Sequence, residues 1–363
     1  MSELDDVLAA LETASDDVAL ATIIGVRGSK YRREGARLVV PAEGETVGNI
    51  SGGCLEGDVI QTAHEVLASG APQVLHFDLT ADDEAVWGWG LGCNGAIDVL
   101  VEPAANARPF VAAMQAARGR HRAVALVTVV EGPQTGARLV VHPTGSTEGE
   151  LGESARAAGL EALATGRSAT VSVDGVQAFV EVLNPPLRLV VCGAGHDAIP
   201  VVEFGARLGW RVEVVDDRRG FLHGTRFPHA ARLVNSQPGA AADAVQPDDR
   251  TYVIVMSHNF LRDAAYLRSF LASPAPYLGM LGPAARLDRL LDTLAAEGMP
   301  RPSERDLARL HGPAGLDVGA EGPEEIAWAI VAEILAVHRR AGAGYLRDRG
   351  GPIHPRAAME TVG

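Results

Sequence analysis

Two glycine-flanked cysteines are the residues of this sequence best suited to soft-ligand or nucleophilic chemistry, and the first of them is Cys54. It lies in a glycine-dense loop, Gly48–Asp58, that runs into an expected helix. A cysteine near a helix N-terminus ionises more readily, and the neighbouring Gly52 and Gly53 let a bulky ligand approach its sulfur. The alternative is a small cysteine buried under a tight turn. Cys54 is therefore a candidate for nucleophilic, metal-binding or cofactor-binding chemistry.

The second cysteine, Cys93, repeats this arrangement in the loop Gly90–Gly95, just before an expected strand. Two such loops in one domain favour a functional role and make Cys54 and Cys93 candidate metal ligands. The paired cysteines and supporting histidines of a zinc site are absent from the sequence. The third cysteine, Cys192, lies in a continuous apolar run, so we expect it in the core.

A phosphate-binding loop of the dinucleotide type is the second chemical feature. The segment Gly193–Ala198 matches G-x-G-x-x-A between an expected buried strand and an amphipathic helix. Gly193 allows the tight turn, and Gly195 lets backbone N–H groups approach a phosphate at the helix N-terminus. Asp216 ends the next strand, where a ribose-binding acid is expected, and Arg218 is placed to take a 2′-phosphate. The same turn also occurs in folds that hold no nucleotide.

Two histidines are expected at the same edge of the sheet. His196 lies within the phosphate loop, where it is either a phosphate contact or proton donor, or a helix cap. His258 follows the strand Thr251–Ser257, and the carboxyl ends of parallel strands form the ligand-binding edge of such sheets. Both histidines are candidate catalytic residues. Asp263 is expected to be only an acid in the first turn of the next helix.

The charge balance limits the partners. Lys plus Arg number 32 against 46 Asp plus Glu, giving a net charge of −14 and a pI near 5.2. Such a chain is a poor ligand for nucleic acid, because phosphate binding needs clustered cations. The densest basic segment is Gly28–Arg37, which is either an anion clamp or a solvated hairpin tip.

The composition predicts a cytoplasmic protein. The 3 cysteines in 363 residues cannot form a disulfide framework, which favours a reducing compartment. The acidic N-terminus argues against a signal peptide. No apolar run reaches the roughly 18 residues of a membrane helix, so we expect no membrane insertion.

The elements that position these residues divide at Asn184-Pro185-Pro186, since prolines break sheets and hold the chain extended. We predict an α/β fold with a mixed α/β domain at 1–184, a Rossmann-like doubly wound parallel sheet at 187–345 and a flexible tail at 346–363. In the first domain we expect no internal repeat, but a hairpin through Asp174-Gly175. Its expected strands are 20–26, 37–40, 74–78, 97–102, 123–130, 137–141, 168–173 and 178–183, and its helices 55–67, 109–118 and 153–163.

The second domain alternates strands and helices, as right-handed crossovers in a parallel sheet require. The expected strands are 187–192, 211–216, 232–235, 251–257 and 277–280, and the helices are 197–208, 260–271, 284–296 and 323–340.

Eight segments together resemble the XdhC/CoxI family of molybdenum-enzyme maturation factors over nearly the whole chain. They are Gly28–Leu38, Gly48–Val59, Trp89–Gly95, Val190–Val201, Val214–Arg218, Ser257–Asn259, Tyr277–Arg286 and Gly315–Ile334.

The resemblance implies an accessory protein rather than a metabolic enzyme. Family members bind the molybdopterin form of the molybdenum cofactor, protect it and assist its sulfuration, with a cysteine desulfurase as sulfur donor. They then insert it into apo xanthine dehydrogenase or a related molybdenum hydroxylase. The family's two cysteine loops correspond to Cys54 and Cys93, and its phosphate loop to Gly193, Gly195 and His196.

Two other functions fit the same residues. An NAD(P)-dependent oxidoreductase would use the phosphate loop with Asp216, and His196 or His258 as proton donor. A partner-binding scaffold would leave the Rossmann-like domain vacant. The maturation role requires Cys54 and the phosphate loop to border one cavity. It favours a homodimer, in which a shared cleft shields an air-sensitive ligand.

Overall fold

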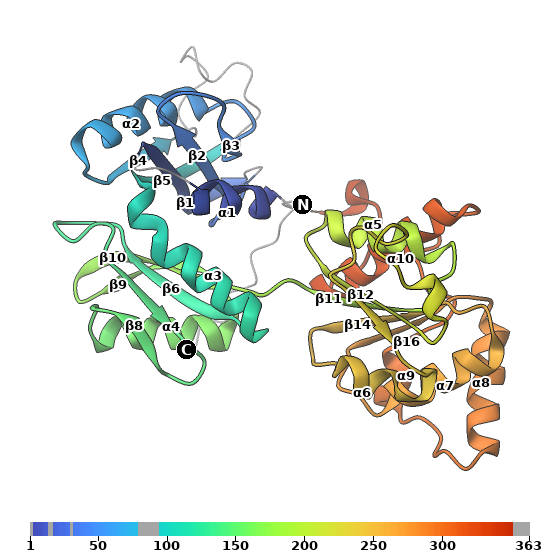
Figure 1. Cartoon of the computed structure of the whole chain (residues 1–363). Helices are drawn as coiled ribbons and strands as arrows, with labels where there is room; N and C mark the ends of the chain where they lie inside the picture. Colours follow the sequence, from blue (N-terminus) through green and yellow to red (C-terminus); the bar gives the residue numbers. More distant parts are fainter. Residues whose placement is uncertain (1–2, 14–16, 30–31, 79–93, 351–363) are drawn as a thin grey trace. The chain divides into compact units, whose positions relative to one another are not determined.

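The chain forms two compact units, one within Glu3–Pro185 and the other within Pro186–Asp348 (Figure 1). The computed structural model describes residues 3–13, 17–29, 32–78 and 94–350. Adjacent prolines, Pro185 and Pro186, lie at the division, where they cannot donate backbone hydrogen bonds. In the described part of the chain, every helix is too short or too polar to cross a bilayer.

The N-terminal unit contains two five-stranded sheets in which every paired strand is antiparallel. The first has the order β3-β2-β1-β5-β4 and the second β8-β7-β6-β10-β9. The first half consists of α1 (Glu3–Thr13), β1 (Val18–Ser29), β2 (Arg37–Pro41), β3 (Val47–Gly48), α2 (Glu56–Ser69), β4 (Gln73–Asp78) and β5 (Asn94–Pro103). The second consists of α3 (Arg108–Arg120), β6 (Val124–Val129), β7 (Arg138–Val141), β8 (Thr147–Gly149), α4 (Glu153–Thr165), β9 (Ala169–Val173) and β10 (Val176–Leu183).

These halves are an internal repeat, so the prediction of no repeat is wrong. Both run helix, three strands, helix, two strands, and their sheets have the same order. The sequence GARLVVPAEGETVGNI at 35–50 returns as GARLVVHPTGSTEGEL at 136–151, with nine of sixteen positions identical. The glycine that ends the third strand is Gly48 in one half and Gly149 in the other. A Cβ on either would lie 2.4 Å from a carbonyl oxygen of the preceding strand, so both positions require glycine.

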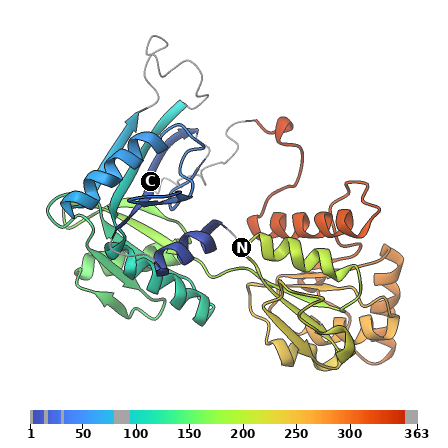
Figure 2. The same cartoon turned by 45° about the horizontal axis from the view of Figure 1, so that its top comes forward.

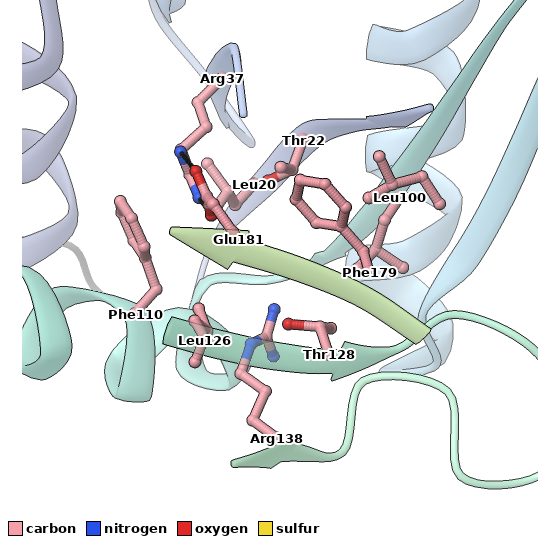
Figure 3. Close-up of a pocket in the computed structure, with 11 residues that line it drawn as sticks. Leu20, Thr22, Arg37, Leu100, Phe110, Leu126, Thr128, Arg138, Phe179 and Glu181 are labelled. Carbon is pink, nitrogen blue, oxygen red and sulfur yellow. Dashed lines mark hydrogen bonds and ion pairs between the residues drawn. The ribbon is translucent and has the colours of Figure 1, made fainter. Parts of the chain in front are cut away.

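Reciprocal ion pairs join the two halves in the interior. Arg37 of the first sheet donates to Glu181 of the second (Nη1–Oε1, 3.1 Å), and Arg138 of the second sheet pairs with Glu102 of the first. All four side chains are at least nine-tenths buried. Figure 3 shows Arg37, Glu181 and Arg138 around a cavity of about 10 Å³, which has room for one water at most. Each half thus supplies one arginine and one glutamate to the contact.

The C-terminal unit is a six-stranded parallel sheet with the order β13-β12-β11-β14-β15-β16. This is the doubly wound Rossmann order, which confirms the predicted fold class. Its elements are β11 (Arg188–Cys192), α5 (Ala198–Arg207), β12 (Arg211–Asp216), β13 (Arg232–Asn235), α6 (Ala241–Val245), β14 (Thr251–Val255), α7 (Phe260–Leu271), β15 (Tyr277–Met280), α8 (Ala284–Ala296), α9 (Glu304–Ala308), β16 (Leu310–His311) and α10 (Pro323–Arg339).

Helices cover both faces of this sheet. Figure 2 shows α5 and α10 side by side over one face, and α6, α7 and α8 pack on the other. Successive residues of β11 point alternately to the two layers: Leu189 and Val191 toward α5 and α10, and Val190 and Cys192 toward α7 and α8. The apolar run therefore forms a strand buried on both faces, and Cys192 lies in the core as expected.

Candidate functional site

The first candidate site is the turn between β3 and α2, residues Ser51–Leu55, which we call the Cys54 turn. The Ser51 hydroxyl oxygen accepts hydrogen bonds from the N–H groups of Cys54 and Leu55, both at 3.0 Å. Gly52 and Gly53 are exposed and have positive φ angles of 89° and 111°. These glycines allow the chain to turn sharply and leave no side chains over the neighbouring cysteine.

The carboxylate of Glu56, the first residue of α2, folds back over the Cys54 turn. It accepts hydrogen bonds from the backbone N–H groups of Ser51 (3.0 Å), Gly53 (2.9 Å), Gly52 (3.3 Å) and Leu55 (3.2 Å), and from the Ser51 hydroxyl. Burial alone would raise the pKa of Glu56, but these hydrogen bonds outweigh burial and lower it. The ionised carboxylate therefore holds the turn together.

The Cys54 thiol is free and half-buried, and it packs against the hydrophobic cluster of the first sheet and α2. It therefore remains accessible to a ligand at the surface. Cys192 provides the contrast: it is fully buried, and burial followed by the charges of Asp263 and Asp216 raises its pKa well above the ordinary value. Only one of these two thiols is placed for chemistry.

The connections around the Cys54 turn gather at one end of the first sheet. Strand pairing brings the end of β1 (Ser29) opposite the start of β5 (Asn94), and the end of β3 beside the start of β2. Arg32 reaches across this end and donates from Nε to the carbonyl of Asn49 (3.1 Å). Arg37, from the same basic segment, is instead part of the buried ion pair.

Cys93 lies outside the described residues, so the predicted pairing of Cys54 with Cys93 around a metal stays a prediction. Among the residues that the structure describes, no three His, Cys, Asp or Glu side chains group closely enough to hold a metal ion on their own.

The second candidate site is the carboxyl edge of the Rossmann sheet, where the β11–α5 and β14–α7 loops meet. Gly193 has a φ of 112°, and a Cβ there would lie 2.7 Å from the Cα of Ser257. The first glycine of the phosphate loop is therefore required by close packing of the two loops. A Cβ on Gly195 would contact only the His258 ring, at 3.8 Å.

The two candidate histidines lie on these loops. His196 is exposed, and its carbonyl accepts from the N–H of Ile199 (3.0 Å) within the turn. His258 adopts a left-handed backbone conformation with φ of 57°, and its Nε2 lies 2.9 Å from a carboxylate oxygen of Asp197. Asp197 immediately precedes α5. The sequence did not single it out, yet it links the two loops.

Asp216 and Arg218 engage each other. Both carboxylate oxygens of Asp216 are occupied: Oδ2 accepts from the N–H of Ala194 (2.7 Å) and from Arg218 Nη2 (2.8 Å), and Oδ1 from Arg218 Nε (3.0 Å). Burial would raise the pKa of Asp216, but the bonds from Arg218 and Ala194 outweigh it and lower the pKa to about 2. In this arrangement a ribose would have to displace Arg218 or the backbone donor.

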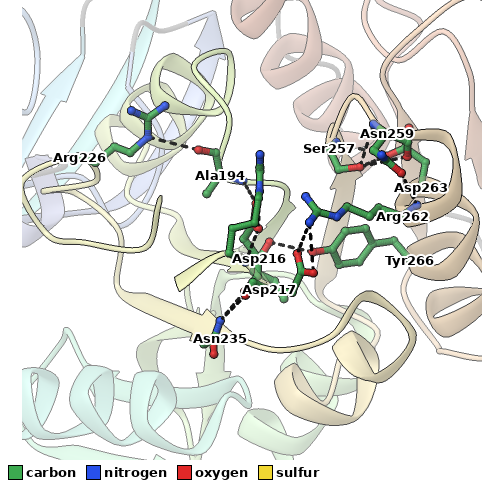
Figure 4. Close-up of polar contacts among 12 residues, drawn as sticks. Ala194, Asp216, Asp217, Arg226, Asn235, Ser257, Asn259, Arg262, Asp263 and Tyr266 are labelled. Carbon is green, nitrogen blue, oxygen red and sulfur yellow. Dashed lines mark hydrogen bonds and ion pairs between the residues drawn. The ribbon is translucent and has the colours of Figure 1, made fainter. Parts of the chain in front are cut away.

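Figure 4 shows further polar contacts on this edge that were not predicted from the sequence. Arg226 donates from Nε to the carbonyl of Ala194 (3.2 Å), which places a guanidinium at the phosphate loop. Asp263 is buried, accepts from the Ser257 hydroxyl (2.5 Å) and pairs with Arg286 (2.6 Å). It therefore ties the β14–α7 loop to the start of α8 and is more than an acid in a first helical turn.

Comparison with known proteins covers both units. A family model described as the XdhC Rossmann domain matches residues 189–334, and one described as the XdhC and CoxI family matches residues 11–78. A Bacillus subtilis protein named as a probable xanthine dehydrogenase subunit is 30% identical over 349 residues, covering 94% of this chain and 99% of that protein. The molybdenum cofactor insertion chaperone PaoD of Escherichia coli is 23% identical over 318 residues, covering 88% and 82%. A crystal structure from Bacillus halodurans, described as a xanthine dehydrogenase, has a TM-score of 0.78 and 29% identity, covering 94% of this chain and 97% of that one.

Proposed function

The chain belongs to the XdhC and CoxI family, and from this premise we propose that it is a maturation factor for xanthine dehydrogenase or a related molybdenum hydroxylase. In this role it binds the molybdopterin form of the molybdenum cofactor as cargo, protects it, assists its sulfuration and inserts it into the apo-enzyme. The similarity to a molybdenum cofactor insertion chaperone over 88% of the chain supports the cargo.

The structural observation that carries the proposal is the Cys54 turn. A free, half-buried thiol lies beside two exposed glycines at the start of a helix, where a bulky ligand has access to sulfur. Thiolate is a soft ligand that suits a molybdenum centre. The same thiolate suits sulfur relay: its attack on the outer sulfur of a desulfurase persulfide forms an S–S bond and releases the donor's thiolate.

The phosphate loop of the C-terminal unit is suited to an anionic group, and molybdopterin carries a phosphate. The N-terminus of α5 offers partial positive charge, and Arg226 adds a guanidinium that Ala194 holds in place. Arg218, the cation expected from the sequence, is instead paired with Asp216. We assign anion binding here to Gly193–Ala198, with Arg226 as the supporting cation.

The test is retention of released molybdenum cofactor. Purified chain is mixed with the cofactor under anaerobic conditions and passed through a gel-filtration column, and molybdenum and pterin are measured in the protein peak. We expect wild type and Cys192→Ala to retain the cofactor and Cys54→Ala to lose at least about nine-tenths of it, the equivalent of one strong contact. Equal, low retention by wild type and Cys54→Ala would remove the chemical basis of the proposal.

Two partner assignments belong to the same proposal. Incubation with a cysteine desulfurase and cysteine should add one sulfur to the peptide that carries Cys54, as seen by mass spectrometry. Light scattering should show a homodimer.

The phosphate loop is tested by Gly195→Asp. This substitution should lower cofactor retention, whereas unchanged retention would indicate a partner-binding scaffold with a vacant Rossmann domain.

An NAD(P)-dependent oxidoreductase is the second candidate, because the strand order and the G-x-G-x-x-A loop are those of dinucleotide-binding folds. The engagement of both Asp216 oxygens by Arg218 and Ala194 favours the maturation role, since that carboxylate would otherwise bind the ribose. Fluorescence titration with NADH and NADPH separates the two: saturable binding supports the oxidoreductase, and its absence at millimolar cofactor excludes it.

A further inference from the structure

The internal repeat provides a reference for the Cys54 turn within the same molecule. Ile50 and Leu151 occupy the same position after the third strand of each half. Between Leu151 and the first residue of α4, Glu153, there is one residue, Gly152; between Ile50 and the first residue of α2, Glu56, there are five. The connection from the third strand to the following helix is therefore four residues shorter in the second half than in the first.

The four additional residues are Ser51–Cys54. Leu55, which corresponds to Gly152, is buried in the core of the first half and serves the fold. Gly52 and Gly53 are exposed, and a Cβ on Gly53 would meet nothing within 4 Å. The φ of 111° at Gly53, and not close packing, requires glycine at this position. The absence of side chains at Gly52 and Gly53 also leaves the space beside Cys54 open to an external group.

The glutamates that begin the two helices also differ in what they contact. Glu153 points into solvent and pairs with Arg156 of its own helix, at 2.8 Å. Glu56 turns back and binds backbone N–H groups on both sides of Cys54, those of Gly53 and Leu55. The same residue type at the same helix position is a surface ion pair in one half and holds the cysteine turn in the other.

We propose that Ser51–Cys54 is a ligand-handling insertion into a duplicated scaffold and that Glu56 is the positioning residue that holds Cys54 in it. This inference rests on the proposed function for the identity of the ligand. The insertion is dispensable for folding, because the second half folds without it. The carboxylate of Glu56 holds the turn because it accepts from the N–H groups of Ser51 and Gly53, which precede α2. The N–H groups of Gly52 and Leu55 also donate elsewhere, to Asn49 Oδ1 and to the Ser51 hydroxyl.

The matched pair Glu56→Gln and Glu153→Gln in the full chain tests the positioning role. The amide keeps the size of the side chain but loses the charge and one acceptor. We expect Glu56→Gln to lower the unfolding temperature by no more than about 5 °C, the effect of a lost helix cap. Alkylation of Cys54 by N-ethylmaleimide should rise several-fold, because the turn opens and the half-buried sulfur becomes exposed. Cofactor retention should fall about tenfold or more.

Glu153→Gln should behave as wild type in all three measurements. An unchanged alkylation rate in Glu56→Gln would overturn the positioning role, and this readout needs no molybdenum cofactor. If wild-type protein retains no cofactor but Glu56→Gln still speeds alkylation, the proposed function fails and the positioning of Cys54 by Glu56 stands.

A deletion of Ser51–Cys54, which joins Ile50 to Leu55 as Leu151 is joined to Gly152, tests the insertion itself. We expect cooperative unfolding within about 5 °C of wild type and no cofactor retention above the level of Cys54→Ala. Loss of cooperative unfolding would show that the four residues serve the fold and would overturn the inference. Full retention of the cofactor would overturn it as well.

Discussion

The two halves of the N-terminal unit share a strand order and differ in the connections at one end of each sheet. Fourteen residues separate Thr22 from Arg37 in the first half, and nine separate the equivalent Thr128 from Arg138 in the second. The connection into the helix is four residues longer in the first half. Its last two strands, β4 and β5, are separated by residues 79–93, whereas Asp174-Gly175 alone separates β9 from β10.

This difference shows which parts of the unit serve the fold and which are available for chemistry. Strands, helices, the buried ion pairs and the glycines that end β3 and β8 occur in both halves. Cys54 and Cys93 occur only in connections that the second half shortens. At the corresponding end of the second half lies an open hollow of about 580 Å³, whose lining includes Asn106, Gln134 and Glu150. Chemistry-bearing loops on a rigid scaffold are the usual arrangement of a binding site.

The largest effects are expected where the two halves depend on each other. Glu102→Ala and Glu181→Ala each leave a buried arginine without its partner, Arg138 or Arg37. Each substitution should lower the free energy of unfolding by about 3–5 kcal/mol, because an unpaired buried charge is costly. Urea unfolding followed by circular dichroism measures both. If the two variants lose the same free energy of unfolding within about 1 kcal/mol, the two buried ion pairs are equivalent.

A double variant shows whether Glu181→Ala loses stability through the unpaired charge of Arg37 or through lost packing. The double variant Arg37→Met with Glu181→Leu removes both charges of one pair and should recover most of the stability lost in Glu181→Ala. If the double variant is as unstable as the single one, lost packing rather than an unpaired charge dominates. If only one of Glu102→Ala and Glu181→Ala lowers the free energy of unfolding, the two buried ion pairs are not equivalent.

A smaller effect is expected from the glycines that end the third strand in each half. Gly48→Ala and Gly149→Ala would place a Cβ 2.4 Å from the carbonyl oxygens of Arg37 and Arg138, at φ angles of 93° and 125°. Each should cost about 2–3 kcal/mol in the free energy of unfolding. Gly57→Ala, within α2 and free of neighbours within 4 Å, should instead be neutral or slightly stabilising. Destabilisation confined to one half would show that the third strands are not equivalent.

Most elements of the fold are predictable from the sequence because their signals are local. The apolar run of β11 and the strand–helix alternation after it predict a parallel sheet, and the structure confirms the Rossmann order. Asp174-Gly175 predicts the hairpin, which forms with positive φ at both residues. The internal repeat was missed although GARLVV occurs twice, because its halves differ in loop length and composition elsewhere.

The candidate site was less predictable, because hydrogen-bond partners depend on how loops fold. The sequence identified Cys54, but nothing in it distinguishes Glu56, which holds the turn, from Glu153, which faces solvent. Asp263 has the position of an ordinary acid in a first helical turn, but it is buried, accepts from the Ser257 hydroxyl and pairs with Arg286 of α8. The conformation of a loop, which sets the contacts of Glu56, is not encoded in spacing or periodicity. The same is true of contacts between separate segments, such as that of Asp263 with Arg286.

Asp216 in the C-terminal unit is, like Glu56, a carboxylate that accepts from backbone N–H groups. Its removal should give the smallest of the predicted changes in the free energy of unfolding. Its pKa falls from an ordinary 3.8 to about 2 in the folded chain, so it should contribute about 2 kcal/mol above pH 5. Because the folded pKa is the lower one, this contribution is lost as pH falls, with roughly half remaining at pH 3. Urea unfolding of wild type and Asp216→Asn between pH 7 and pH 3 should therefore show a gap that narrows with acid. A gap that stays constant would mean that Asp216 stabilises by packing alone, and the analogy with Glu56 would fail.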